Sequence, residues 1–108
     1  MTNIEVTVRH LSEKNFGGIK EYADLQAKRF AEKFPRTISL KLVVDKQAHL
    51  YSADVVVQMK DLGQLSSQAQ AETGASAIDV ALNRTGRQIR ETRSKKKDSY
   101  MRVAKNAE

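Results

Sequence analysis

Three consecutive segments in the middle of the chain alternate between apolar and polar residues, and this alternation constrains the fold most strongly. The segments span Thr37–Asp45, Tyr51–Met59 and Gln64–Ala71. A period of two residues is typical of a β-strand with one buried face. The connections between the segments are short enough for neighbouring strands to pair antiparallel. Gly63, which ends the second connection, accepts the positive φ that a hairpin turn requires. The sequence therefore predicts three adjacent antiparallel strands.

The two faces of these predicted strands differ in polarity. The residues expected in the core are Ile38, Leu40, Leu42 and Val44 of the first strand, Tyr51, Ala53, Val55, Val57 and Met59 of the second, and Leu65, Ser67, Ala69 and Ala71 of the third. The small residues of the third strand favour a helix packed closely above it. Its other face, Gln64, Ser66, Gln68 and Gln70, is wholly polar, and we expect it to face water.

A fourth alternating segment, Asn3–Arg9, precedes a segment with helical periodicity that ends at Pro35, the single proline. The apolar residues of that helix form one stripe, made of Ile19, Tyr22, Ala23, Ala27, Phe30 and Phe34. Ser12 is a suitable N-cap. Gly17 and Gly18 are poor helix formers and favour a break after the first turn.

A second helical pattern follows the strands and begins near Thr73 or Ser76, either of which can serve as its N-cap. Its buried stripe is predicted to contain Ala77, Ile78, Ala81, Leu82, Thr85 and Ile89. Asp79 is assigned to the first turn, where a carboxylate interacts favourably with the helix N-terminus.

The predicted order is β-α-β-β-β-α, an α+β fold in which both helices cover one face of a four-stranded sheet. The strands Asn3–Arg9 and Thr37–Asp45, if adjacent, run parallel through a right-handed crossover. We expect one domain over residues 1–97. The periodic pattern ends there, so residues 98–108 are expected to form a flexible tail.

The positive charge of the chain is concentrated in Arg84–Lys97. This segment holds seven of the 19 lysines and arginines and one acid, Glu91, so its charge is +7 − 1 = +6, equal to the net charge of the whole chain. Charge placed in this way is typical of proteins that bind a polyanion. A solvated helical tail is the alternative interpretation. A spacing of three residues is expected to place four arginines in a gently winding row along the helix. The predicted RNA-binding residues are Arg84, Arg87, Arg90, Arg93, Lys95, Lys96, Lys97, Arg9 and Lys28.

No set of residues in the sequence has the spacing of a catalytic or metal site. The chain has no cysteine, which excludes disulfides and cysteine zinc sites. His10, His49 and Asp54 lack partners at a suitable spacing. We therefore expect no enzyme activity, cofactor, metal or small-molecule substrate. No apolar run reaches the roughly 18–20 residues that span a bilayer, and the N-terminus lacks the order of a signal peptide. A cytoplasmic protein without a membrane partner is expected.

Several short motifs together carry a resemblance to a known family. They are Lys33-Phe34 at the end of the first helix, the strand SADVVV from Ser52, Gly63 in the turn, Glu72 before the second helix and AID at Ala77–Asp79. Arg84, Arg87, Gln88, Ile89, Arg93 and Lys95 then fall on the positions of the family pattern. Over nearly its whole length the chain resembles the ribosome hibernation factors, also called ribosomal subunit interface proteins. Their fold is similar to the double-stranded-RNA-binding fold with an extra N-terminal strand.

The chain departs from the family pattern at three positions. Ala75 replaces a tyrosine, Glu91 stands where a lysine is frequent, and Gly86 replaces a good helix former. In an exposed helix this glycine would cost about 1 kcal/mol.

The resemblance implies a specific partner. Family members bind the small ribosomal subunit, with its 16S-type rRNA, in the channel used by mRNA and tRNA, and they block translation during starvation. Long members carry a C-terminal dimerising domain, for which this chain is too short. The short neutral tail favours the form that promotes ribosome dimers, and the resemblance implies a monomer off the ribosome. Three alternatives remain open: a general structured-RNA-binding module or RNA chaperone, a small RNA-modifying enzyme, and an interaction domain for an acidic protein.

Overall fold

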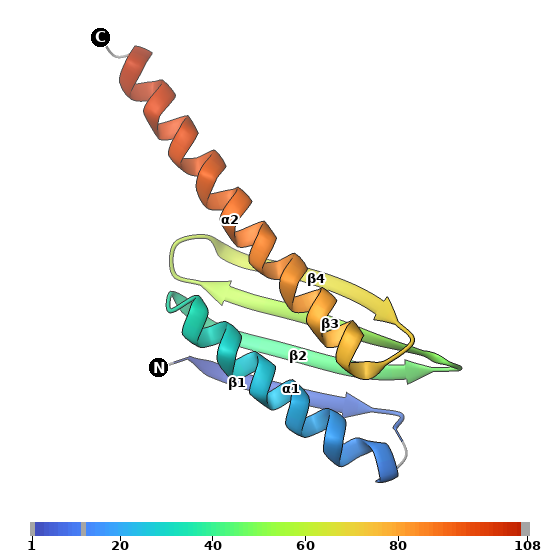
Figure 1. The fold of residues 1–108 in the computed structure, drawn as a ribbon. Helices are drawn as coiled ribbons and strands as arrows, with labels where there is room; N and C mark the ends of the chain where they lie inside the picture. Colours follow the sequence, from blue (N-terminus) through green and yellow to red (C-terminus); the bar gives the residue numbers. More distant parts are fainter. Residues whose placement is uncertain (1, 12, 107–108) are drawn as a thin grey trace.

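The computed structural model describes residues 2–11 and 13–106. Its elements are β1 (Asn3–Arg9), α1 (Glu13–Lys33), β2 (Thr37–Gln47), β3 (Leu50–Met59), β4 (Gly63–Ala71) and α2 (Gly74–Asn106). The predicted order β-α-β-β-β-α and the α+β class are confirmed (Figure 1). Ser12, the predicted N-cap of α1, lies outside the described residues.

The four strands form one mixed sheet in the order β1-β2-β3-β4. β1 pairs parallel with β2, and the other two pairings are antiparallel. Gly63 has a φ of 74°, as predicted for the turn between β3 and β4. Side chains alternate between the two faces along each strand. The register of the strands places the apolar side chains on the same face of the sheet. The polar residues predicted for the other face of β4 are all exposed: Gln64, Ser66, Gln68 and Gln70.

One prediction about β2 is wrong. Ile38 was expected in the core, but its side chain is 42% exposed, whereas Thr37 is buried. The register between β2 and β3 shifts between Thr37 and Ser39. This irregularity inserts an extra residue into the strand, so Thr37 and Leu40 both face inward. The Thr37 hydroxyl donates a hydrogen bond to Met59 Sδ at 3.3 Å.

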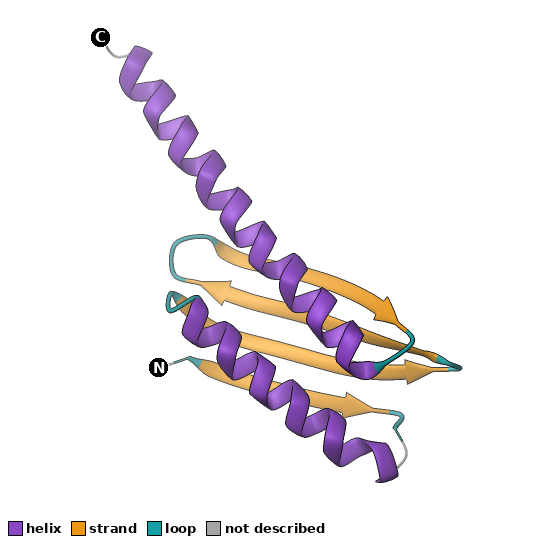
Figure 2. Cartoon of the chain, viewed as in Figure 1, coloured by secondary structure: helices purple, strands orange, loops and turns teal. Residues whose placement is uncertain are grey.

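Both helices cover the apolar face of the sheet, as predicted (Figure 2). α1 packs on β1 and β2, and α2 packs on β3 and β4. The two apolar stripes lie in or against the core. Ser67 allows the predicted close approach to β4, since its hydroxyl lies 3.3 Å from the Ala81 carbonyl oxygen of α2 and donates to it.

The helix starts and ends follow local signals, with one exception. Thr73 rather than Ser76 caps α2, because its hydroxyl accepts a hydrogen bond from the Ser76 amide at 3.2 Å. α1 is continuous across Gly17 and Gly18, so the predicted break is wrong. Burial of the α1 stripe against the sheet outweighs the low helix propensity of two glycines.

α2 continues well beyond the sheet (Figure 1). A helix of 33 residues is about 50 Å long, and the molecule extends 64 × 28 × 16 Å. The helical backbone includes residues 98–106, where the sequence pattern ended. The flexibility expected of residues 98–108 stays a prediction.

Candidate nucleic-acid interface

A groove of about 500 Å³ lies between the C-terminal half of α1 and the middle of α2. Its walls and floor are formed by Gln26, Arg29, Phe30, Lys33, Phe34, Asp79, Leu82, Asn83, Gly86, Arg87 and Arg90. The helices run side by side in the same direction. Near the start of the groove, Tyr22 of α1 contacts Asp79 of α2. Further along both helices, Phe34, which directly follows α1, faces Gly86 and Arg90 of α2.

The floor of the groove is apolar and tightly packed. Phe30, Phe34 and Leu82 are each at most 7% exposed, and the two phenylalanine rings lie 4.7 Å apart between centroids. Gly86 is buried here, so the cost that a glycine has in an exposed helix does not apply to it directly. A Cβ at Gly86 would lie 3.3 Å from Phe34 Cζ. The missing side chain therefore lets α2 approach the Phe34 ring closely.

Four exposed bases line the groove: Arg29 and Lys33 from α1, Arg87 and Arg90 from α2. Two of them contact the same ring. The Arg90 guanidinium carbon lies 5.7 Å from the Phe34 centroid, and Lys33 Nζ lies 5.9 Å from it. Both distances fall within the range of cation–π attraction. Guanidinium and ammonium groups on opposing helices form a site suited to phosphate oxygens.

The other end of the groove carries an acid. The Tyr22 hydroxyl donates to both oxygens of Asp79, at 2.7 and 2.8 Å. This hydrogen bond, followed by burial of the phenol and the charge of Asp79, raises the pKa of Tyr22 above its ordinary value. Asp79 lies in the second turn of α2 and joins the two helices, so its predicted role at the helix N-terminus is wrong.

The predicted row of arginines does not form a single surface. At 100° per residue, each step of three residues leaves the next arginine about 60° short of a full turn. The three steps from Arg84 to Arg93 therefore rotate the row by about 180° around the helix. Arg84 Nη1 donates to the Gln68 backbone oxygen of β4 at 2.7 Å. Arg87 and Arg90 line the groove. The predicted row is therefore divided among three environments.

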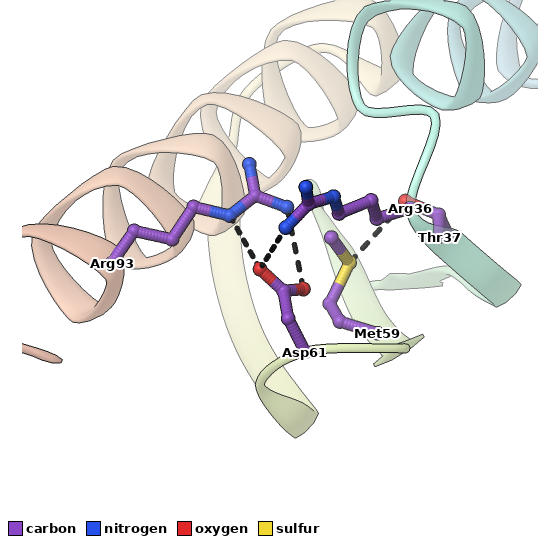
Figure 3. A network of polar contacts seen from close by, with 5 residues as sticks. All are labelled: Arg36, Thr37, Met59, Asp61 and Arg93. Carbon is purple, nitrogen blue, oxygen red and sulfur yellow. Dashed lines mark hydrogen bonds and ion pairs between the residues drawn. The ribbon is translucent and has the colours of Figure 1, made fainter. Parts of the chain in front are cut away.

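Arg93 contacts the turn between β3 and β4 (Figure 3). Its Nε donates to Asp61 Oδ2 at 2.9 Å, and Arg36 Nη1 lies 3.5 Å from the same oxygen. The hydrogen bond from Arg93 is the main reason why the pKa of Asp61 is lowered, with the charges of both arginines contributing. Arg93 thus connects α2 to the sheet at the point where the helix leaves it.

Three further predicted basic residues lie outside the groove. Arg9, Lys28 and Lys95 are exposed and do not line it. The side chains of Lys96 and Lys97 lie outside the described part of the structure. Sequence reasoning missed Arg29 and Lys33. Arg29 and Lys33 follow Gln26 by three and seven residues, so the three side chains form a polar stripe beside Phe30 and Phe34. This helical spacing could have identified them in the sequence.

No cluster of metal ligands is found within residues 2–11 and 13–106. That part of the chain has no group of three His, Asp or Glu residues able to hold a metal ion. His10 Nδ1 lies 2.7 Å from Asp45 Oδ1 at the end of β1, and His49 is exposed. Among the described helices, none has the length and apolar character needed to cross a membrane.

Two solved structures resemble this arrangement over nearly their whole length. A ribosomal subunit interface protein from Coxiella burnetii superposes with a TM-score of 0.69 at 12% identity, covering 87% of this chain and 99% of the other. This chain has the fold of a ribosomal subunit interface protein. The Protein Y N-terminal domain of Thermus thermophilus gives a TM-score of 0.68 at 18% identity, with coverages of 85% and 99%. No protein-family model and no curated protein sequence matches the chain.

Proposed function

We propose that this protein is a non-catalytic, cytoplasmic ribosome-binding factor. In this proposal it occupies the mRNA and tRNA channel of the small ribosomal subunit and inhibits translation under stress. The observation that carries the proposal is the groove between α1 and α2, in which four exposed bases flank an apolar floor. Its fold is that of a ribosomal subunit interface protein, so a groove with this charge suits ribosomal RNA.

The charges of the groove favour a phosphate backbone over a specific base sequence. Four bases against one acid, Asp79, give the lining a charge of +4 − 1 = +3. Contacts between such bases and phosphate fix the position of a protein on RNA without identifying the sequence. Recognition then depends on the shape of the RNA. The ribosomal channel supplies a fixed arrangement of phosphates of this kind.

Sedimentation with purified small subunits at low and high salt tests the proposal. The wild-type protein is expected to co-sediment at low salt. The double variant Arg87→Ala/Arg90→Ala is expected to bind at least tenfold more weakly, because each hydrogen bond to a charged group is worth about 1.5–3 kcal/mol. Inhibition of translation in a reconstituted system should fall in parallel.

A charge-matched control separates the groove from the overall charge. Lys41 and Lys60 are exposed, and neither lines the groove between the helices. The variant Lys41→Ala/Lys60→Ala loses the same two charges and is expected to bind like the wild type. Failure of the wild type to co-sediment at low salt would rule out the proposal. Equal losses in the two double variants would rule out the groove as the interface.

A general structured-RNA-binding module is the second candidate. It is favoured by the lining of the groove, in which the charged groups are suited to any phosphate backbone. A gel shift with an isolated RNA duplex, in competition with small subunits, distinguishes the two functions. Ribosome binding predicts that the subunits displace the duplex at a low molar ratio, whereas a general module predicts comparable affinities.

A further inference from the structure

We infer that the groove between α1 and α2 holds one unpaired RNA strand, with a base stacked on the Arg90 guanidinium. The inference rests on the proposed function and names the form of RNA that the same site accepts. It assigns Arg90 a contact with a base and assigns phosphate contacts to Arg29, Lys33 and Arg87.

The dimensions of the groove favour a single strand. The two helices touch at the floor of the groove, where a Cβ at Gly86 would lie 3.3 Å from Phe34 Cζ, and the space above this contact is about 500 Å³. From Asp79 to Arg90 the groove spans eleven residues of α2, or about 16 Å. A duplex would rest on the exposed rims and would not reach the floor at Phe34, which is 6% exposed.

Phe34 holds Arg90 in place for stacking. The ring is fixed from below by Phe30, with centroids 4.7 Å apart. Its backbone is fixed as well, because the Phe34 amide donates to the Phe30 carbonyl at 2.9 Å. The Arg90 guanidinium lies over this ring and is exposed to solvent. A planar guanidinium held near an aromatic ring can stack on an unpaired nucleobase.

Gly86 contributes to this platform by its lack of a side chain. It lies one helical turn before Arg90, and a Cβ there would be in tight contact with the Phe34 ring, at 3.3 Å from Cζ. The Phe34 ring thus lies close to both Gly86 and Arg90.

The two ends of the groove carry opposite charges. Lys33 and Arg90 lie at the Phe34 end, whereas Asp79 lies at the Tyr22 end. The Asp79 carboxylate repels phosphate, so the phosphates of the strand are held near the basic side chains. Between the two ends, Gln26 and Asn83 supply amide groups that can donate to or accept from base edges. Phosphate contacts and base contacts thus fall on different residues.

The experiment compares oligomers of equal charge, one with bases and one without. The probes are a labelled hexamer of adenylate, the corresponding hexamer of abasic ribose phosphates, and a 12-base-pair RNA duplex. Affinities are measured by fluorescence anisotropy at about 0.1 M salt for the wild type, Arg90→Lys and Arg87→Lys. Both substitutions keep the positive charge. Thermal unfolding checks that each variant is folded.

The wild type is expected to bind the adenylate hexamer roughly 5- to 150-fold more tightly than the abasic hexamer, the range that stacking of one base provides. It is also expected to bind the hexamer more tightly than the duplex. Arg90→Lys should lose most of the preference for bases, because an ammonium group has no planar face. Arg87→Lys should keep that preference while binding both hexamers more weakly.

Two results would overturn the inference: equal binding of both hexamers by the wild type, or a preference for bases that survives in Arg90→Lys. Tighter binding of the duplex would also overturn it. Co-sedimentation of the same proteins with small subunits is measured in parallel. A wild type that binds subunits but does not discriminate between the hexamers refutes the stacked strand and leaves the proposed function intact, whereas absence of both activities refutes both.

Discussion

The effect of Gly86 on stability depends on its surroundings in the folded protein. On an exposed helix it would only reduce helix stability, by up to about 1 kcal/mol. In the structure it is buried against Phe34. The cost in helix propensity is therefore offset by close packing of α2 on the aromatic floor of the groove.

The pair Gly18 and Gly86 provides a matched test of this interpretation. Gly18→Ala is expected to raise the free energy of unfolding by about 0.5–1 kcal/mol, because a Cβ there has nothing within 4 Å. Gly86→Ala is expected to gain less, or to lose stability, since its Cβ would lie 3.3 Å from Phe34 Cζ. Urea denaturation of both variants provides the comparison. An equal gain in the two variants would show that the Phe34 contact is unimportant.

At the scale of elements, α2 has two parts with different surroundings. Its first half is buried through residues such as Ile78, Ala81 and Ile89. Its second half extends past the sheet (Figure 1). Arg93 marks the transition, because it is hydrogen-bonded to Asp61 in the turn between β3 and β4 (Figure 3). This contact fixes the direction in which the basic segment leaves the sheet.

The Asp61→Asn variant measures what this contact contributes. We expect it to lower the free energy of unfolding at pH 7 by about 0.5–1 kcal/mol, the upper part of the range for accessible ion pairs. The pKa of Asp61 is lowered in the folded state. Its stabilisation is thus present above the unfolded pKa of roughly 3.9 and is lost as the pH falls through the lower folded value.

Urea denaturation at pH 7 and at pH values below 4 checks both parts of this prediction. The wild type and Asp61→Asn should converge in stability as the pH falls. Asp54→Asn, on the outer face of β3, is the control and should change stability little at either pH. A difference for Asp61→Asn that is the same at all pH values would contradict the assignment to the Arg93 ion pair.

At the scale of the whole molecule, charge is separated between the two faces of the sheet. The helical face bears the four bases of the groove. The open face bears neutral polar residues along β4 and a mixture of acids and bases elsewhere. Under the proposed function, these basic residues would direct the helical face toward the RNA.

The salt dependence of binding to small subunits reports how many phosphates are neutralised. If Arg29, Lys33 and Arg87 each contact one phosphate, the slope of log Kobs against log salt is about −2.1 to −2.7. Arg87→Ala/Arg90→Ala removes one of these phosphate contacts and should reduce the magnitude of the slope by about 0.7–0.9, whereas Lys41→Ala/Lys60→Ala should leave it unchanged. Affinities are measured at salt concentrations of about 50 to 200 mM, with the Mg²⁺ concentration held constant. Equal slopes for all three proteins would mean that the groove does not contact phosphate.

The candidate site could be predicted only in part from the sequence. Helical phasing identified Arg87 and Arg90 as exposed bases, and both line the groove. It did not identify Arg29 and Lys33: their spacing from Gln26 marks a polar stripe on α1, but whether that stripe lines a groove depends on where α2 packs. It also grouped Arg84 and Arg93 with them, although these arginines contact Gln68 and Asp61 instead.

The sequence by itself determined the type and order of the elements. Alternation with a period of two residues requires half-buried strands, and apolar stripes with a period near 3.6 require helices on one face. Thr73, Pro35 and Gly63 act through local backbone geometry, so their roles at element ends were predictable.

Only the tertiary structure decided which side chains meet between elements. The extra residue in β2 exposed Ile38 and buried Thr37, because the register with β3 depends on both strands. The Tyr22–Asp79 hydrogen bond and the contact of Gly86 with Phe34 set the relation of α1 to α2. These contacts join residues at least 52 positions apart, from 34 to 86, and no local periodicity reports such distances. For that reason the basic segment was evident in the sequence, whereas the groove formed with α1 was not.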